Sequence, residues 1–247
     1  MTEPPPPTPA MPLEKSGPAP QRIYAIGDIH GRLDLLERAI AAIARDVAER
    51  GPAALTVTVG DYIDRGPASR GVIDLLAQDP FAAPLVALKG NPEDVLETFL
   101  ADPAVGPHWL DNGGLATLRS YGVDLRGLGR ADFAAARDAL RAALPPAHRD
   151  FLRGLRTSFS AGDYFFCHAG VRPGVALDRQ SEEDLIWIRG EFLGSTEDFG
   201  KTVVHGHTPV PEPEVRPNRI GIDTGAYASG RLTCVALEGR RPRFLAV

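Results

Sequence analysis

The sequence of 247 residues has few cysteines, few aromatic side chains and no long apolar run. Two cysteines, Cys167 and Cys234, are too few for a disulfide framework, so we expect a reducing, cytoplasmic setting. No apolar stretch approaches the ~18–20 residues that cross a bilayer, and no basic flank precedes an apolar segment at the N-terminus. We therefore expect neither a membrane partner nor a secretory signal.

Basic residues are fewer than acidic ones. The chain has 27 Lys and Arg against 32 Asp and Glu, a formal net charge of −5, which argues against nucleic acid as a partner. The length suffices to bury a substantial core in one large domain or a small pair of domains. A protein of this charge that binds phosphate must concentrate positive charge locally, through metal ions and a few arginines.

The first 20 residues contain eight prolines and few large apolar side chains. Such a segment cannot form a core, so residues 1–20 are predicted to be a disordered tail. A docking peptide for a proline-recognising partner is the alternative interpretation. The folded domain is expected to span residues 21–247.

Short β-rich runs alternate with helical patterns in the first hundred residues. Strands are predicted at 23–26, 55–59 and 85–88, with helices around 36–47 and 72–76 between them. This order predicts an α/β fold with right-handed crossovers. Ligands of such sheets gather beyond the carboxyl ends of the strands.

The middle of the chain changes character. Residues 94–157 are predicted to be mostly helical, with a loop around Asn112, and to form a cap or insertion that shapes one wall of a cleft. Strand patterns return at 164–167, 202–204, 219–222 and 232–237. A second sheet packed on the first is the simplest prediction.

Five short motifs place Asp, Asn or His beside glycine just after predicted strands. One such Gly-Asp pair normally marks a turn or a helix cap, but five in matching locations indicate a common site. They are Gly27-Asp28-Ile29-His30-Gly31, Gly60-Asp61-Tyr62-Ile63-Asp64-Arg65-Gly66, Gly90-Asn91-Pro92-Glu93-Asp94, His168-Ala169-Gly170 and Gly206-His207-Thr208.

These motifs offer a mixed set of oxygen and nitrogen donors. Asp28 and His30 can face one point across a tight turn, and the carboxylate of Asp61 can bridge two cations. Such a set suits Mn, Fe, Zn or Co better than Ca or an all-thiolate zinc site. His205 could support the site or be a spare polar residue. The six candidate ligands are Asp28, His30, Asp61, Asn91, His168 and His207.

The ordered motifs resemble those of the phosphoprotein phosphatase branch of the calcineurin-like metallophosphoesterases. The compact size is similar to that of its bacterial serine/threonine phosphatase-like members, as are Asn112-Gly113-Gly114, Ser120-Tyr121-Gly122, Trp187-Ile188-Arg189 and His205-Gly206-His207-Thr208. The resemblance covers roughly residues 22–240. It implies a two-sheet αββα sandwich and a dinuclear metal centre that activates water to attack the phosphorus of phosphoric monoesters.

The resemblance also implies roles for individual residues. Asp28, His30 and Asp61 would hold the first metal, and Asp61, Asn91, His168 and His207 the second. Manganese is the expected metal, with iron and zinc as alternatives. Arg65 would grip the phosphate, and Arg189 would be a second, less closely matched phosphate ligand. A surface ion pair is the alternative interpretation of each arginine.

The third motif departs from the family pattern at Pro92. The family has a histidine here that protonates the leaving group, supported by the aspartate equivalent to Asp64. Proline carries no proton donor, so we expect a loss of about 10²–10⁴-fold on alkyl esters and a mild effect on aryl esters. Asp64 would then be a structural or weakly catalytic residue.

The local fold around Pro92 is nevertheless expected to form. Asn91 can cap a helix, proline suits the first turn, and the acids Glu93 and Asp94 favour the positive end of the helix. Proline also biases Asn91 toward extended backbone angles.

Three functions are compatible with these residues. The first is a metal-dependent phosphatase acting on a phosphoprotein or a small phosphoester. The second is an impaired pseudophosphatase that binds phosphoproteins or nucleotides without turnover. The third is a dinucleoside polyphosphate hydrolase built on the same metal core. The sequence leaves the oligomeric state open.

Overall fold

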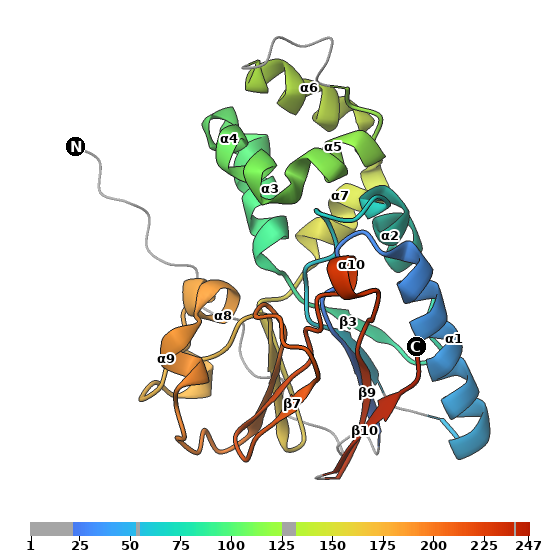
Figure 1. The fold of residues 1–247 in the computed structure, drawn as a ribbon, viewed down its shortest axis with the longest axis vertical. Coiled ribbons are helices and arrows are strands. Elements are labelled where there is room, and N and C mark those ends of the chain that lie inside the picture. Colours follow the sequence, from blue (N-terminus) through green and yellow to red (C-terminus); the bar gives the residue numbers. More distant parts are fainter. Residues whose placement is uncertain (1–21, 53–54, 125–131, 240) are drawn as a thin grey trace.

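Two five-stranded sheets form the centre of the molecule (Figure 1). The computed structural model describes residues 22–52, 55–124, 132–239 and 241–247, so the predicted N-terminal tail lies outside the described residues. The first sheet has the order β10-β9-β1-β2-β3, formed by Arg241–Leu245, Cys234–Glu238, Ile23–Ile26, Leu55–Thr58 and Leu85–Ala87. The second has the order β4-β5-β6-β8-β7, formed by Ser158–Ala161, Tyr164–Cys167, Thr202–His205, Arg219–Gly221 and Glu214–Val215.

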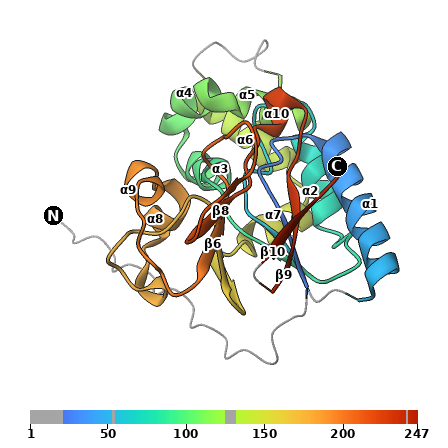
Figure 2. The same ribbon diagram turned by 60° about the horizontal axis from the view of Figure 1, so that its bottom comes forward.

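Each sheet contains three parallel strands, which are flanked by antiparallel strands on one side in the first sheet and on both sides in the second. In the first sheet β1, β2 and β3 are parallel, in the register Ile23 with Leu55 and Thr56 with Leu85. In the second sheet β5, β6 and β8 are parallel. The carboxyl ends of the parallel strands in each sheet therefore share one edge, where loops from both sheets meet (Figure 2).

Helices cover the outer face of each sheet, which confirms the predicted αββα sandwich. Helices α1 (Leu33–Arg50) and α2 (Ser69–Leu76) lie on the first sheet, and α8 (Glu182–Trp187) and α9 (Gly190–Leu193) lie on the second (Figure 1). Strand β1 alternates between the two cores that result. Tyr24 and Ile26 belong to the core under the helices, whereas Ala25 faces the core between the sheets.

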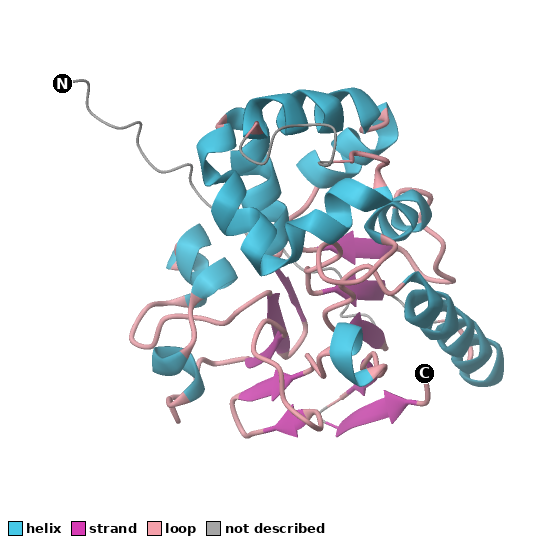
Figure 3. Cartoon of the chain, turned by 45° about the horizontal axis from the view of Figure 1, so that its top comes forward, coloured by secondary structure: helices cyan, strands magenta, loops and turns pink. Residues whose placement is uncertain are grey.

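A group of helices rises above the sandwich between β3 and β4 (Figure 3). These helices are α3 (Asn91–Ala101), α4 (Gly106–Trp109), α5 (Leu115–Ser120), α6 (Phe133–Ala143) and α7 (Pro146–Arg153). Short helical turns at Pro103–Val105 and Leu110–Gly114 join α3 to α5. Gly113 has a φ of 112° inside the second turn, so the chain kinks where a loop was predicted around Asn112.

Two short helical elements of the described chain remain. A short 3₁₀ turn, Leu177–Arg179, precedes α8, and α10 (Ala226–Ser229) joins β8 to β9. Among the described residues, no helix is both long and apolar enough to span a membrane.

Candidate metal centre

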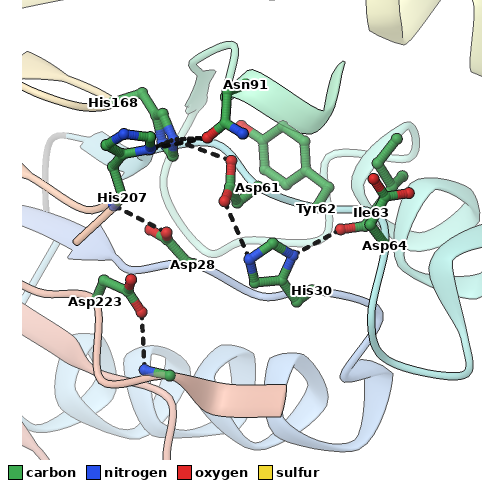
Figure 4. Close-up of polar contacts among 12 residues, drawn as sticks. Asp28, His30, Asp61, Tyr62, Ile63, Asp64, Asn91, His168, His207 and Asp223 are labelled. Carbon is green, nitrogen blue, oxygen red and sulfur yellow. Dashed lines mark hydrogen bonds and ion pairs between the residues drawn. The ribbon is translucent and has the colours of Figure 1, made fainter. Parts of the chain in front are cut away.

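All six predicted ligands converge at the shared edge of the sheets (Figure 4). They come from five loops that are far apart in the sequence, because each loop follows the carboxyl end of a parallel strand. Asp28 and His30 follow β1, Asp61 follows β2, Asn91 opens α3 after β3, and the remaining two, His168 and His207, follow β5 and β6.

The carboxylate of Asp61 lies at the centre of the cluster. Its Oδ2 is 3.0 Å from Nε2 of His30, and its Oδ1 is 3.0 Å from Nε2 of His168. Burial opposes ionisation of Asp61, but the charges of His168 and His30 outweigh it and hold the pKa of this carboxyl well below its usual value. One carboxylate that faces two nitrogen donors in opposite directions has the arrangement of a bridging ligand.

A second set of donors meets beside Oδ1 of Asp61. The amide Oδ1 of Asn91 lies 2.8 Å from Nδ1 of His207 and 3.1 Å from Nε2 of His168. The two imidazole nitrogens are themselves 3.2 Å apart. Three donor atoms from three loops therefore face one another.

The main chain determines the tautomers of two of these histidines. Nδ1 of His30 lies 2.8 Å from the carbonyl oxygen of Ile63, and Nδ1 of His168 lies 2.9 Å from that of Val59 (Figure 4). A carbonyl oxygen only accepts, so each Nδ1 must carry a proton, and in a neutral ring Nε2 presents its lone pair. Each Nε2 faces Asp61, so the position between them is filled either by a second ring proton, whose charge lowers the pKa of Asp61, or by a cation. A cation can replace both protons, so the donor set fits divalent metal ions.

Asp28 contributes an oxygen that lacks a protein partner. The backbone N–H of His207 donates to Oδ2 at 2.9 Å, while Oδ1 is buried and has no hydrogen bond within the described chain. Ligand atoms of Asp28, Asp61 and His168 lie within 4.8 Å of one another, which is suitable for holding a metal ion. Burial, then the charges of Asp223 and Asp61, raise the pKa of Asp28 well above its usual value. A bound cation would stabilise its ionised form.

The loops that carry these donors adopt unusual backbone angles. Six non-glycine residues have positive φ in the described chain, and five belong to the predicted motifs: His30, Asp61, Asp64, Arg65 and His207, with φ between 44° and 70°. Such conformations cost about 1–3 kcal/mol each and cluster at functional sites. Glycine neighbours make the close packing possible, since a Cβ on Gly206 would lie 1.9 Å from Oδ1 of Asp28.

Glu93 is a structural residue of the site whose role the sequence reasoning missed. Its carboxylate accepts hydrogen bonds from the backbone N–H groups of Asp61, Tyr62 and Gly90 at 2.8–3.0 Å and from Ile63 at 3.3 Å. It thereby ties the loop after β2 to the start of α3. Its spacing from Gly90, three residues as in a capping box, was the available signal.

The start of α3 differs from the prediction in one respect. Gly90, not Asn91, is the N-cap, and Asn91 is the first helical residue instead of an extended one. The side chain of Asn91 consequently points at the histidines, and the carboxylate of Glu93 satisfies the N–H of Gly90. Pro92 occupies the first turn as predicted and is buried.

Asp223 is a second residue that the sequence reasoning missed. It lies beside Asp28 (Figure 4), is 3% exposed, and accepts a hydrogen bond from the N–H of Gly225 at 2.8 Å. Burial raises its pKa. Its signal was the same as that of the other motifs, an aspartate near a glycine after the strand that ends at Gly221.

The carboxylate of Asp64 accepts hydrogen bonds from two residues of the helical segment. Trp109 donates its indole N–H to Oδ2 at 2.9 Å, and Thr117 donates its hydroxyl to Oδ1 at 2.6 Å. Burial raises the pKa of Asp64 to about 7, although both hydrogen bonds act in the opposite direction. Both carboxyl oxygens therefore have protein partners without a side chain from position 92.

Arg65 lies at the rim of the cluster, next to an aromatic ring. Its guanidinium carbon is 4.7 Å from the ring centroid of Tyr227, and the same ring meets His30 edge-to-face at 5.3 Å. The Arg65 guanidinium forms no ion pair with any residue that the structure describes. It therefore remains available to an anion bound next to the candidate metal ligands.

Arg189 and Trp187 form the opposite rim. The indole of Trp187 lies edge-to-face with His207 at 6.4 Å. Burial, the charge of His168 and then that of Arg189 lower the pKa of His207 to about 3. Arg189 is exposed and, within the described ranges, forms no ion pair. Both side chains line a cleft of about 280 Å³ over α8 and α9.

His205 lies behind the cluster and supplies no ligand atom toward it. Its ring packs edge-to-face on Phe192 at 5.0 Å, and Nδ1 lies 3.0 Å from the carbonyl oxygen of Gly206. Burial lowers its pKa to about 4, so it is a neutral packing residue.

Comparison with known proteins agrees with this geometry. The chain is 27% identical over 222 residues to serine/threonine-protein phosphatase 2 of Escherichia coli (strain K12), covering 86% of this chain and 91% of that protein. It is 26% identical over 228 residues to the asymmetrical bis(5'-nucleosyl)-tetraphosphatase PrpE of Halalkalibacterium halodurans, covering 85% and 87%. A solved structure of a protein assigned as a diadenosine tetraphosphatase superimposes with a TM-score of 0.63 at 22% identity, covering 91% of this chain and 92% of that one.

The sequence profile of the calcineurin-like phosphoesterases matches residues 21–235, which is most of the chain. All five motif loops lie within that match. The chain therefore belongs to the calcineurin-like metallophosphoesterase family and is a metal-dependent phosphoesterase.

Proposed function

We propose that this protein is a phosphatase that hydrolyses phosphoric monoesters on proteins or small molecules, with two divalent ions, preferably manganese, as cofactors. Two cations held there would supply Lewis acidity and lower the pKa of coordinated water. The observation that carries the proposal is the convergence of six donor atoms whose lone pairs face one another around Asp61. The two buried free cysteines fit a cytoplasmic location.

The ligand assignment follows the two halves of the cluster. Asp28, His30 and Asp61 would hold the first ion. Asp61 would share the second with the donors that meet beside its Oδ1, namely Asn91, His168 and His207. Imidazole, carboxylate and amide donors in one site suit manganese, iron and zinc.

Two arginines would grip the phosphoryl group. Arg65 and Arg189 lie on opposite rims of the cluster, and neither has an ion pair among the described residues. A guanidinium donates paired N–H groups that match two phosphoryl oxygens. The helical segment 94–157 would form one wall of the site, since its Trp109 and Thr117 hold Asp64.

A protein phosphatase role is favoured by the relative in Escherichia coli, which is named a serine/threonine-protein phosphatase. The relative in Halalkalibacterium halodurans is named a dinucleoside tetraphosphatase, so hydrolysis of a dinucleoside polyphosphate is the second candidate. An impaired, phosphate-binding protein is the third, and Pro92 is the reason to retain it.

Two substrates test the proposal. With Mn²⁺ present, para-nitrophenyl phosphate is expected to be hydrolysed readily and a phosphoserine peptide about 10²–10⁴-fold less efficiently, because only the second needs a proton donor. Phosphate release and bound metal are measured on the same sample, with a chelator-treated sample as the control. Bound manganese without turnover of either substrate would reject the phosphatase in favour of a binding protein.

Tyr227 provides a test of the role of Arg65. Its exposed ring lies 4.7 Å from the guanidinium carbon of Arg65, so Tyr227→Ala is expected to raise KM for para-nitrophenyl phosphate about 2- to 5-fold with little change in kcat. Tyr227→Phe keeps the ring and is expected to retain the wild-type KM. An unchanged KM in the alanine variant would show that the stacking does not position Arg65 for phosphate.

A further inference from the structure

Few large apolar side chains are exposed on the described surface, and one of them borders the metal cluster beside α3. The exposed set is Trp187, Val215, Tyr227 and Phe244. Trp187 is 37% exposed, and its ring meets His207 edge-to-face. Trp187 lies at the end of α8, outside the five motifs, and the proposed hydrolysis gives it no role.

The position of Trp187 is fixed relative to Pro92. Its indole N–H donates to Oδ2 of Asp94 at 3.3 Å, and Asp94 belongs to the first turn of α3, as Pro92 does. The ring therefore borders the turn that carries Pro92 instead of a proton donor. A leaving group that departs past this turn meets no proton donor at position 92 and has the indole of Trp187 beside it.

The cleft beyond Trp187 carries more negative than positive side chains. Its charged lining contains three carboxylates against two guanidiniums. Arg172 is paired with Asp184 at 2.9 Å and with Glu191, so Arg189 is the free cation of the charged lining. A dinucleoside polyphosphate would bring several negative charges next to these carboxylates, whereas a phosphopeptide brings a single phosphoryl group.

We propose that the cleft receives the aromatic leaving group of a phosphotyrosine side chain, with its ring against Trp187 and its peptide in the acidic part of the cleft. This inference rests on the proposed phosphatase function. An aryl ester places an aromatic ring directly on the leaving oxygen, as the position of Trp187 requires. In a nucleotide the sugar separates the base from the phosphates.

A phenolic leaving group is compatible with a proline at position 92. Hydrolysis forms a bond between a water oxygen and phosphorus and breaks the bond from phosphorus to the phenolic oxygen. The tyrosine oxygen departs with the bonding electron pair and takes a proton from solvent. Its conjugate acid, the phenol, has a pKa of about 10, which is well below the pKa of an alcohol such as serine. Departure of the phenolate therefore needs no donor at position 92.

Two peptides of identical sequence, one with phosphotyrosine and one with phosphoserine, test the inference on the manganese-loaded protein. The wild type is expected to prefer phosphotyrosine by at least about 100-fold in kcat/KM. Trp187→Ala is expected to reduce that preference about 3- to 10-fold, and Trp187→Phe to restore most of it. Phe244→Ala removes a similarly exposed aromatic ring on β10 and is expected to leave the preference unchanged.

Binding provides a readout that does not depend on turnover. A peptide with a non-hydrolysable phosphonate analogue of phosphotyrosine is expected to quench the indole fluorescence of the wild type but not of Trp187→Phe. Equal hydrolysis of both peptides, or faster hydrolysis of diadenosine tetraphosphate than of the phosphotyrosine peptide, would overturn the inference and leave the phosphatase intact. No turnover of any substrate by the metal-bound protein would instead reject the phosphatase itself.

Discussion

Replacing Asp61 by asparagine is expected to remove metal binding and catalysis together. Both carboxylate oxygens of Asp61 face histidines, so the amide would lose one anionic donor to each ion. Loss of partners outside the ligand shell costs about 10–100-fold in metal affinity or activity, so loss of a bridging ligand should exceed about 100-fold. Metal content and kcat/KM for para-nitrophenyl phosphate are the measurements.

The same variant separates metal binding from folding. Manganese is expected to raise the melting temperature of the wild type, because a ligand of the native state stabilises it by mass action, and to leave that of Asp61→Asn unchanged. Asp163→Asn is the matched control, since it makes the same chemical change at an exposed turn between β4 and β5. A full complement of two manganese ions in Asp61→Asn would contradict the bridging role.

Pro92→His is expected to give the largest gain in activity. An imidazole at this position would add a general acid, which contributes about 10²–10⁴-fold. The gain should appear with the phosphoserine peptide and stay small with para-nitrophenyl phosphate, whose leaving group needs little protonation. The ratio of kcat/KM for the two substrates is therefore the measurement.

The existing contacts of Asp64 would limit the effect of a histidine at position 92. Its Oδ2 already accepts the indole N–H of Trp109, so a new imidazole at 92 would have to compete for that oxygen. The double variant Pro92→His with Trp109→Phe frees Oδ2 and is expected to show the larger gain. Pro92→Gln adds a polar side chain without an acid and serves as the control. An equal gain with glutamine would contradict a missing proton donor.

The sequence predicted those parts of the fold that repeat a simple pattern. Strands β1 and β5 occupy the predicted residues, because short apolar runs bounded by glycine or polar residues have few other interpretations. Strand β9 begins at Cys234 instead of Leu232, and β2 ends at Thr58, where the chain turns toward the site. Strand ends depend on the ladder partner, which the sequence alone does not specify.

Elements that depend on tertiary contacts were not predicted. Strand β10, Arg241–Leu245, alternates weakly and exists as the antiparallel partner of β9. Strand β4 and the short helices α8, α9 and α10 likewise lack a clear periodicity. Trp187 and Tyr227 project from two of these helices. The arginines of the rim, Arg65 and Arg189, were predicted from the sequence, but the aromatic contacts of Trp187 and Tyr227 with the histidines were not.

The candidate ligands were predictable for a different reason. Donor residues beside glycine at the ends of parallel strands form a pattern that can be recognised in the sequence without knowledge of the packing. Glu93 and Asp223 were missed although each had a signal in the sequence, because their contacts are to backbone N–H groups and the sequence pattern does not identify those partners. The close contact between Arg65 and Tyr227 joins residues 162 positions apart and needed the structure.

The carbonyl oxygens of Val59 and Ile63 have a consequence for how this enzyme can change over time. They orient His168 and His30 and choose which ring nitrogen keeps its proton. Both partners are peptide groups, so a point mutation that swaps one side chain for another deletes neither oxygen. Apolar substitutions that preserve the packing of these two buried positions therefore leave the protonation pattern of the two imidazoles unchanged.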